Sequence, residues 1–195
     1  DYYRAQRLEL QRQLEQAANL PRKQQEEKRE QLLSQLEIVT VRLLHYELQI
    51  DPLHGYYRCY NRWVDEAIEN RRFGYDMRLR DVLLDFLKMI SPENKKADHA
   101  RRNWLEKRTP RINIQRDGAI LWIRRHLARE DFPRAERVAE KLRHSQKPLF
   151  QWDKVDDPFY KAALLVTWGK ARIFTWKLDE ETVALLQQVE TWIGD

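Results

Sequence analysis

Positive charge is the most concentrated chemical feature of the sequence. Residues 95–129 contain eleven lysines and arginines and three acids, a net charge of +8, so the rest of the chain, whose total is +5, sums to −3. Such a segment favours phosphate groups, because each neutralised phosphate releases condensed counterions. Trp104 and Trp122 lie in the same segment, where each could stack on a base or pack in a helix. We therefore predict a nucleic-acid contact made by Lys95, Lys96, Arg101, Arg102, Lys107, Arg108, Arg111, Arg116, Arg124 and Arg125.

Two other interpretations of the basic segment stay open. It could face an acidic protein, or it could be solvated, with its charge compensated by acids elsewhere, for instance Glu26, Glu27 and Glu30. Around Thr109-Pro110 a helix is expected to give way to a loop, since proline disfavours helix at the residue before it. A loop there would present several arginines to one phosphate backbone.

Motifs that carry catalysis or hold a cofactor are not found in the sequence. There is no GxxxxGK[ST], GxGxxG or HExxH pattern. One cysteine and five scattered histidines, at positions 45, 54, 99, 126 and 144, do not have the spacing of a zinc site. The acids at 156–157 and 179–181 are expected in a loop and at a helix start. The sequence thus gives no support for an enzyme, and we expect neither a cofactor nor a metal.

The aromatic stretch DPLHGYYRCYNRWVDEAIENRRFGYD, residues 51–76, could be a stacking surface or a core helix. On a helix that starts near Tyr56, the aromatic and aliphatic side chains fall on one face and the charged ones on the other. A stacking surface would instead place aromatics and arginines together. We therefore predict a packed helix with Cys59 as a small core residue; its apolar face consists of Tyr56, Tyr60, Trp63, Val64, Ala67 and Ile68.

Residues 1–50 are expected to form two helices separated at Asn19-Leu20-Pro21. The second carries apolar residues at alternating steps of four and three, the spacing of a coiled-coil seam. Only the β-branched run at 37–41 could compete as a strand. The pattern favours an antiparallel helical hairpin or a projecting coiled-coil arm, and we predict oligomerisation through Leu32, Leu36, Val39, Leu43, Tyr46 and Ile50.

The remaining apolar patterns are also helical. One stripe runs from Leu79 to Ile90 and ends at Ser91-Pro92, and residues 117–193 contain four more. Five glycines and seven prolines are few for a turn-rich β fold. The predicted fold is all-α, with the helical arm at 1–50 followed by an irregular array of packed helical hairpins at 51–195. The four later stripes are Ala119, Ile120, Ile123 and Leu127; Phe132, Ala135, Val138, Ala139 and Leu142; Phe159, Ala162, Ala163, Val166 and Ile173; and Val183, Leu186, Val189 and Ile193.

The cellular setting is constrained only weakly. The chain begins at Asp1 and is expected to be part of a longer polypeptide. A single cysteine suits a reducing compartment, and no apolar run reaches the roughly 20 residues of a membrane span. We expect a cytoplasmic protein without a membrane partner.

Two segments resemble a known family. DGAILWIRRHLAREDFPRAERVAEKLRHSQKPL, residues 117–149, is similar to the helix–"D-F-x-x-A"–helix part of the terminase small (endonuclease) subunits of temperate contractile-tailed phages. FYKAALLVTWGKARIFTWKLDEETVALLQQV, residues 159–189, resembles the helical pair that follows it. YNRWVDEAI, residues 60–68, is similar to an upstream element. The resemblance implies an oligomeric component that recognises viral DNA in the host cytoplasm and hands it to a large motor subunit.

We therefore predict a non-enzymatic, oligomeric helical protein that binds nucleic acid, DNA in preference to RNA, and that is a component of viral DNA packaging. A large motor or assembly subunit is a further expected partner. The alternative is a structural subunit of a larger protein or ribonucleoprotein assembly, in which the arm and the aromatic surfaces are protein interfaces.

Overall fold

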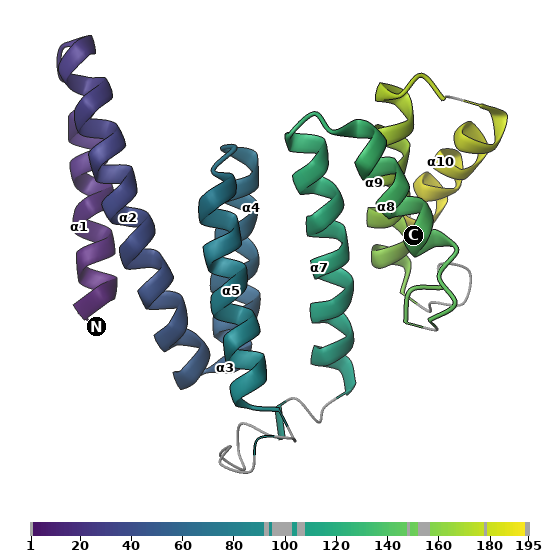
Figure 1. Cartoon of the computed structure of the whole chain (residues 1–195), viewed down its shortest axis with the longest axis horizontal. Helices are drawn as coiled ribbons and strands as arrows, with labels where there is room; N and C mark the ends of the chain where they lie inside the picture. The colour runs from purple at the N-terminus through teal and green to yellow at the C-terminus, as the bar shows by residue number, and fades with distance from the viewer. Residues whose placement is uncertain are drawn as a thin grey trace. The chain divides into compact units, whose positions relative to one another are not determined.

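The computed structural model describes residues 2–91, 94, 103–104, 108–147, 149–151, 157–177 and 179–193, with the backbone alone at 23, 108–111 and 190–193. Every element in these ranges is helical, which confirms the predicted all-α class (Figure 1). The chain divides into two compact units, residues 1–67 with 72–104 and residues 68–71 with 105–195. The predicted arm thus groups with residues 51–67 and 72–104. The elements are α1 (Tyr2–Ala17), α2 (Arg22–Ile50), α3 (Pro52–His54), η1 (Gly55–Tyr60), α4 (Asn61–Glu69), α5 (Phe73–Met89), α7 (Arg108–Ala128), α8 (Phe132–Arg143), α9 (Pro158–Phe174) and α10 (Glu180–Ile193).

The helices α1 and α2 form the antiparallel hairpin that the sequence predicts (Figure 1). Leu10 and Ala17 of α1 pack with Leu32 and Val39 of α2 in one apolar cluster. The competing prediction of a strand at 37–41 is wrong, because burial of one helical face decides the conformation. Thr40 fits the helix by donating its hydroxyl to the Leu36 carbonyl at 2.7 Å.

The predicted oligomerisation seam is used largely inside this hairpin. Leu32, Val39 and Leu43 are buried, and Leu36 packs at the edge of the cluster. Tyr46 and Ile50, at the other end of the seam, are 47% and 75% exposed. Of the seam residues, Tyr46 and Ile50 are the ones with exposed apolar surface. Self-association through the seam stays a prediction that depends on these two residues.

The aromatic stretch is a core helix, as predicted. All six residues of its predicted apolar face are buried, and Cys59 is buried among them. The helix begins earlier than expected, at Pro52, after Asp51 accepts the backbone N–H groups of Leu53 and His54. Its second part, η1, is a π-helix that continues into α4.

Helix α5 completes the described core of the first unit. Leu79, Leu83, Phe86 and Ile90 are buried along one face, in agreement with the predicted stripe. The ring of Trp104 meets that of Phe86 edge to face, with 6.0 Å between centroids, and only 6% of Trp104 is exposed. Trp104 is therefore a packing residue, and its alternative role as a base-stacking surface is not supported.

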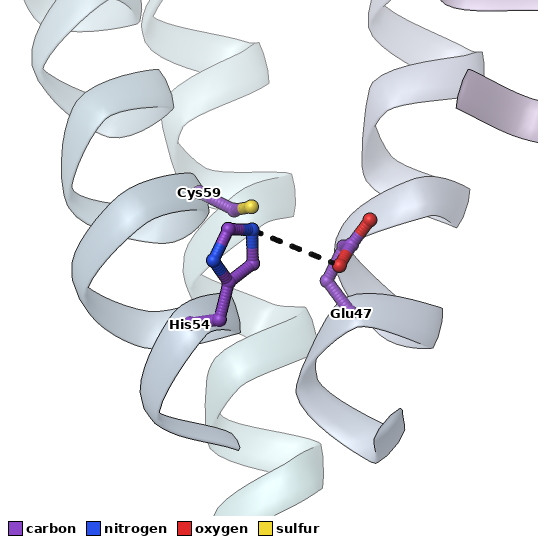
Figure 2. A group of neighbouring side chains, drawn as sticks. All are labelled: Glu47, His54 and Cys59. Carbon is purple, nitrogen blue, oxygen red and sulfur yellow. Dashed lines mark ion pairs between the residues drawn. The ribbon is translucent and has the colours of Figure 1, made fainter. Parts of the chain in front are cut away.

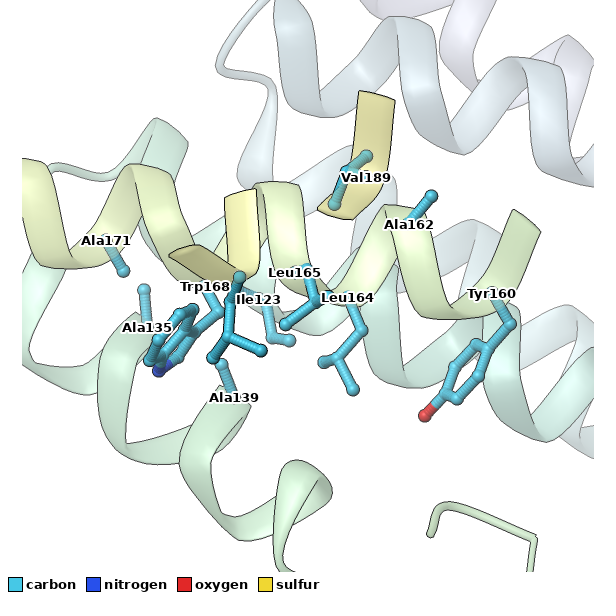
Figure 3. Close-up of a cluster of buried hydrophobic side chains, with 11 residues drawn as sticks. Ile123, Ala135, Ala139, Tyr160, Ala162, Leu164, Leu165, Trp168, Ala171 and Val189 are labelled. Carbon is cyan, nitrogen blue, oxygen red and sulfur yellow. The ribbon is translucent and has the colours of Figure 1, made fainter. Parts of the chain in front are cut away.

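The second unit packs α7, α8, α9 and α10 around a cluster centred on Trp168 (Figure 3). Ile123 of α7 and Ala135 and Ala139 of α8 are fully buried, as their predicted stripes require. Small alanines at these contacts let the helices approach closely enough to enclose the indole.

Three sequence predictions fail in this unit. Thr109-Pro110 does not end a helix, because α7 begins at Arg108 and Pro110 lies in its first turn, where a missing N–H costs nothing. Phe159 and Ile173 are 79% and 47% exposed, since α9 buries a neighbouring face instead, which contains Tyr160, Leu164, Leu165, Trp168 and Ala171. In α10, Val183 is exposed while Thr182, Leu185 and Val189 are buried.

Candidate nucleic-acid interface

The predicted phosphate-binding residues fall into three groups in the structure. Lys95, Lys96, Arg101, Arg102 and Lys107 lie outside the described residues. Arg108 and Arg111 lie in the first turn of α7, where only the backbone is described. Arg116, Arg124 and Arg125 follow along the same helix, and their side chains are placed.

The Arg116 side chain is packed inside the second unit and is not part of an exposed surface. Its Nη1 donates to the Asp157 carboxylate at 3.1 Å and its Nε donates to the Leu149 carbonyl at 3.2 Å. Its guanidinium lies 5.2 Å from the centre of the Tyr160 ring, and 14% of the side chain is exposed. Asp157 also accepts the Tyr160 backbone N–H as the N-cap of α9. Arg116 therefore ties α7 to the start of α9, which argues against its predicted role as a phosphate contact.

Arg124 and Arg125 lie nearer the end of α7 and are partly exposed. Arg124 donates from Nη2 to Glu69 at 3.4 Å, and both residues belong to the second unit. The guanidinium of Arg125 lies 5.5 Å from the centre of the Trp122 ring, within the range of a cation–π contact. Trp122 in turn meets the His126 ring edge to face at 5.1 Å.

The turn between α7 and α8 brings further arginines to this place. Glu130 adopts a left-handed backbone with φ 62°, a conformation that often closes a helix, and its N–H bonds the Leu127 carbonyl at 2.9 Å. The Asp131 N–H bonds the His126 carbonyl at 3.0 Å. Arg129, the first residue after α7, and Arg134 in the first turn of α8 are both exposed.

His126 lies at the centre of this group, and only 4% of it is exposed. Burial lowers the pKa of His126 from its ordinary value; the positive charges of Arg134, Arg125 and Arg129 lower it further, while Asp131 acts in the opposite direction. The imidazole is therefore neutral at neutral pH. We call this group the α7–α8 corner; it consists of Arg124, Arg125, His126, Arg129 and Arg134.

Sequence reasoning identified only part of the corner. Arg124 and Arg125 were predicted as contacts, whereas His126 and Arg134 were not. The signal that could have found them is the pattern R-R-H-x-x-R-E-D-F-P-R, in which basic residues flank a short helix break on both sides. Two acids against four arginines in residues 124–134 leave the corner positive.

Two of the acids named as possible compensation for the basic segment have partners in the first unit. Glu30 accepts from Arg72 at 3.2 Å, and Glu26 lies 3.6 Å from Arg22 on the same helix.

An exposed aromatic surface lies elsewhere in the second unit. Trp176 is 95% exposed and has a left-handed backbone, with φ 57°. Phe174 is 57% exposed and stacks on Phe132 with 4.5 Å between ring centres, and Ile173 next to it is 47% exposed. Exposed apolar groups gathered in this way are typical of interaction surfaces.

One group of possible metal ligands occurs in the described residues, although the sequence spacing predicts none. The ligand atoms of Glu47, His54 and Cys59, all in the first unit, lie within 4.8 Å of one another.

Comparison of the chain with family models, with curated proteins and with solved structures gave no match. The resemblance of residues 117–149 and 159–189 to terminase small subunits therefore stays a sequence-based expectation. None of the described helices combines the length and the apolar character needed to cross a lipid bilayer.

Proposed function

We propose that the protein binds nucleic acid through its phosphate backbone, DNA in preference to RNA, and that the α7–α8 corner is part of the contact surface. The observation that carries this proposal is the position of Arg125, Arg129 and Arg134 on the two sides of the turn between α7 and α8, where Arg129 and Arg134 are exposed. The turn at Glu130 presents side chains from two helices toward one region, which suits a backbone with regularly spaced charges.

The chemistry of the corner fits phosphate better than a carboxylate ligand in a pocket. Guanidinium groups can bind phosphate with two parallel hydrogen bonds and are weakly hydrated, so little solvation is lost on contact. Arg129 and Arg134 are exposed and can reach a large partner without a cleft. Trp122 beside Arg125 offers a ring that could support a base or a sugar.

The wider proposal is a non-enzymatic, oligomeric component of viral DNA packaging. It is supported by the resemblance of residues 117–149 and 159–189 to terminase small subunits. Self-association would use the exposed end of the α2 seam at Tyr46 and Ile50. A large motor subunit would be the further partner.

The test is a salt series of fluorescence anisotropy titrations with duplex DNA and with single-stranded RNA. The double variant Arg129→Ala/Arg134→Ala should weaken binding to all sequences about equally. It should also reduce the slope of log K against log salt by about two units, one for each lost phosphate contact. The matched control is Arg12→Ala/Arg22→Ala, which removes the same charge from exposed positions on α1 and α2.

Two results would contradict the proposal. The first is equal loss of affinity in the corner variant and the control, which would indicate net charge rather than a site. The second is no salt-dependent binding of the unmodified protein to either nucleic acid.

The second candidate function is that of an assembly subunit, which the aromatic surface at Trp176 favours. In that case Phe174→Ser/Trp176→Ser should lower the mass in light scattering while Arg129→Ala/Arg134→Ala leaves it unchanged. If Phe174→Ser/Trp176→Ser leaves the mass unchanged and only Arg129→Ala/Arg134→Ala loses DNA affinity, the phosphate-binding proposal is favoured.

A further inference from the structure

The end of α2 and the π-helix η1 are held unusually close together. A Cβ atom on Gly55 would lie 2.7 Å from the Leu48 nitrogen and 2.9 Å from the Glu47 carbonyl carbon, so only glycine fits without movement of the backbone. Asp51 fixes the corner between the two helices by accepting the N–H groups of Leu53 and His54, each at 3.1 Å. The backbone on both sides of Glu47, His54 and Cys59 is therefore firmly positioned.

The π-helix explains why two of these side chains meet. In an α-helix, residues five apart point about 140° away from each other, given 3.6 residues per turn. In η1 the Asn61 N–H bonds the Tyr56 carbonyl, five residues back, which widens the turn. His54 and Cys59, also five residues apart, consequently lie on the same side and face Glu47 of α2 (Figure 2).

The distances are close to those of a coordinated ion. His54 Nε2 lies 4.0 Å from Glu47 Oε2, and the three ligand atoms are all within 4.8 Å of one another. In a tetrahedral zinc site, S–N and N–O separations are about 3.3–3.6 Å, from the usual metal–ligand bond lengths. Glu47 and Cys59 are buried, whereas the His54 side chain is 49% exposed and has room to turn. Rotation of that side chain can shorten the distances from His54 Nε2 to the other two ligand atoms.

We propose that Glu47, His54 and Cys59 bind one Zn²⁺ ion, with water as the fourth ligand. Thiolate, imidazole and carboxylate are all zinc ligands, and three protein ligands are the number found in zinc sites that keep a water. A divalent ion with one thiolate and one carboxylate gives a neutral group, which suits a buried position. Calcium and magnesium would not use the sulfur.

Arg4 is the competitor for this site in the metal-free protein. Its Nε and Nη2 donate to the two Glu47 oxygens at 2.6 and 2.8 Å. Burial, with a further contribution from Glu47, raises the pKa of Cys59 to about 11, so the thiol is protonated at neutral pH without metal. Binding therefore transfers the Cys59 proton to solvent, forms the Zn–S bond and displaces the guanidinium, 53% of whose side chain is exposed, toward water.

Two measurements on the full chain test the ligand set. Zn²⁺ titrated against a chromophoric chelator should bind at one ion per chain, more tightly as the pH rises. Co²⁺ should give a thiolate-to-metal absorption band that Cys59→Ser abolishes. Cys59→Ser and His54→Ala should each weaken Zn²⁺ binding by more than about tenfold, a loss that even outer-shell substitutions reach. The matched control, His45→Ala, removes an exposed histidine that bonds Gln49 and should leave the affinity unchanged.

Arg4→Gln separates a metal site from a purely structural ion pair. If the guanidinium competes with the ion, this variant should bind Zn²⁺ more tightly than the unmodified chain, and Zn²⁺ should raise its melting temperature by more. Unchanged affinity in both Cys59→Ser and His54→Ala would overturn the proposal, as would the lack of a one-to-one complex. If Arg4→Gln does not fold even with Zn²⁺ present, the two ligand variants still decide.

Discussion

Arginines serve opposite purposes in two regions of the molecule. In the first unit, Arg4 donates two hydrogen bonds to the buried Glu47. Arg72 and Arg78 both donate to the buried Glu37. At the α7–α8 corner of the second unit, Arg129 and Arg134 are exposed on either side of the turn that follows the buried His126. The first arrangement neutralises charge inside the protein, whereas the second accumulates it at the surface.

This difference shows that a count of basic residues does not locate a phosphate-binding surface. Arg116 belongs to the most basic segment of the sequence, yet it is held by Asp157 and the Leu149 carbonyl. Arg134 lies outside that segment, yet it contributes to the positive corner. The fold brings a carboxylate and a backbone carbonyl from distant parts of the chain to the guanidinium of Arg116, and sequence position alone does not show this.

The largest expected effect is the loss of Trp168, whose indole ring packs beneath two arginines of the second unit. Trp168 is fully buried, donates to Glu140 at 2.5 Å, and lies beneath the guanidinium groups of Arg143 and Arg172 at 4.6 and 4.9 Å. Trp168→Ala should therefore lower the free energy of unfolding by about 3–5 kcal/mol. Urea denaturation followed by circular dichroism measures this. Trp176→Ala, at a 95% exposed position, is the control and should change it little.

A smaller loss is expected for Arg4→Ala in the first unit. The substitution leaves the Glu47 carboxylate, with 5% of its side chain exposed, without its main partner. We expect a measurable loss that stays smaller than that of a fully buried pair, because water can enter from the exposed side of the Arg4 position and solvate the carboxylate. The measurement is urea denaturation with a metal chelator present. Arg12→Ala, an exposed i, i+3 pair with Glu9, should cost less than about 1 kcal/mol; equal losses would break the contrast between buried and surface pairs.

The pH dependence of stability tests the corner itself. The pKa of His126 is lowered in the folded protein, so the unfolded chain takes up a proton first as the pH falls below about 6.5. The contribution of His126 to stability is therefore intact above that pH and decreases below it. His126→Gln should show a shallower loss of stability between pH 7 and about pH 5. Identical slopes for the variant and the unmodified protein would show that His126 is not buried as a neutral ring.

The smallest change in stability is expected for Arg129→Ala/Arg134→Ala, within about 0.5 kcal/mol, because both side chains are exposed. The same variant should nevertheless raise the pKa of His126, since two positive charges that disfavour the imidazolium are removed. An NMR titration of the His126 ring protons measures this. A pKa that does not move would place these arginines farther from the ring than the structure has them.

The parts of the fold that sequence predicted are those decided by local apolar spacing. Trp63 and Ile68 were assigned to the core because a helix face is set by residues three and four apart. On α9 the same reasoning selected Phe159, which is exposed, because apolar residues surround most of that helix and leave its phase ambiguous. Periodicity identifies a helix more reliably than it identifies the buried side of an apolar one.

The candidate sites depended on features that spacing does not encode. The approach of His54 to Cys59 requires a π-helix, which adds no recognisable pattern to the sequence. The pairing of Arg116 with Asp157 joins positions 41 residues apart. Charge content suggested a positive surface near the α7–α8 corner. Which arginines lie there depends on a turn whose left-handed residue is Glu130 rather than glycine.

Gly55 has a consequence for how this protein tolerates mutation. It makes no side-chain contact, yet a single added carbon would meet the backbone of α2 at less than 3 Å. Any substitution would force α2 and η1 apart and separate Glu47 from Cys59. Alanine substitution normally measures the effect of removing atoms. At position 55 it would measure the destabilisation caused by adding one carbon atom, at a residue that has no side-chain contacts to indicate its importance.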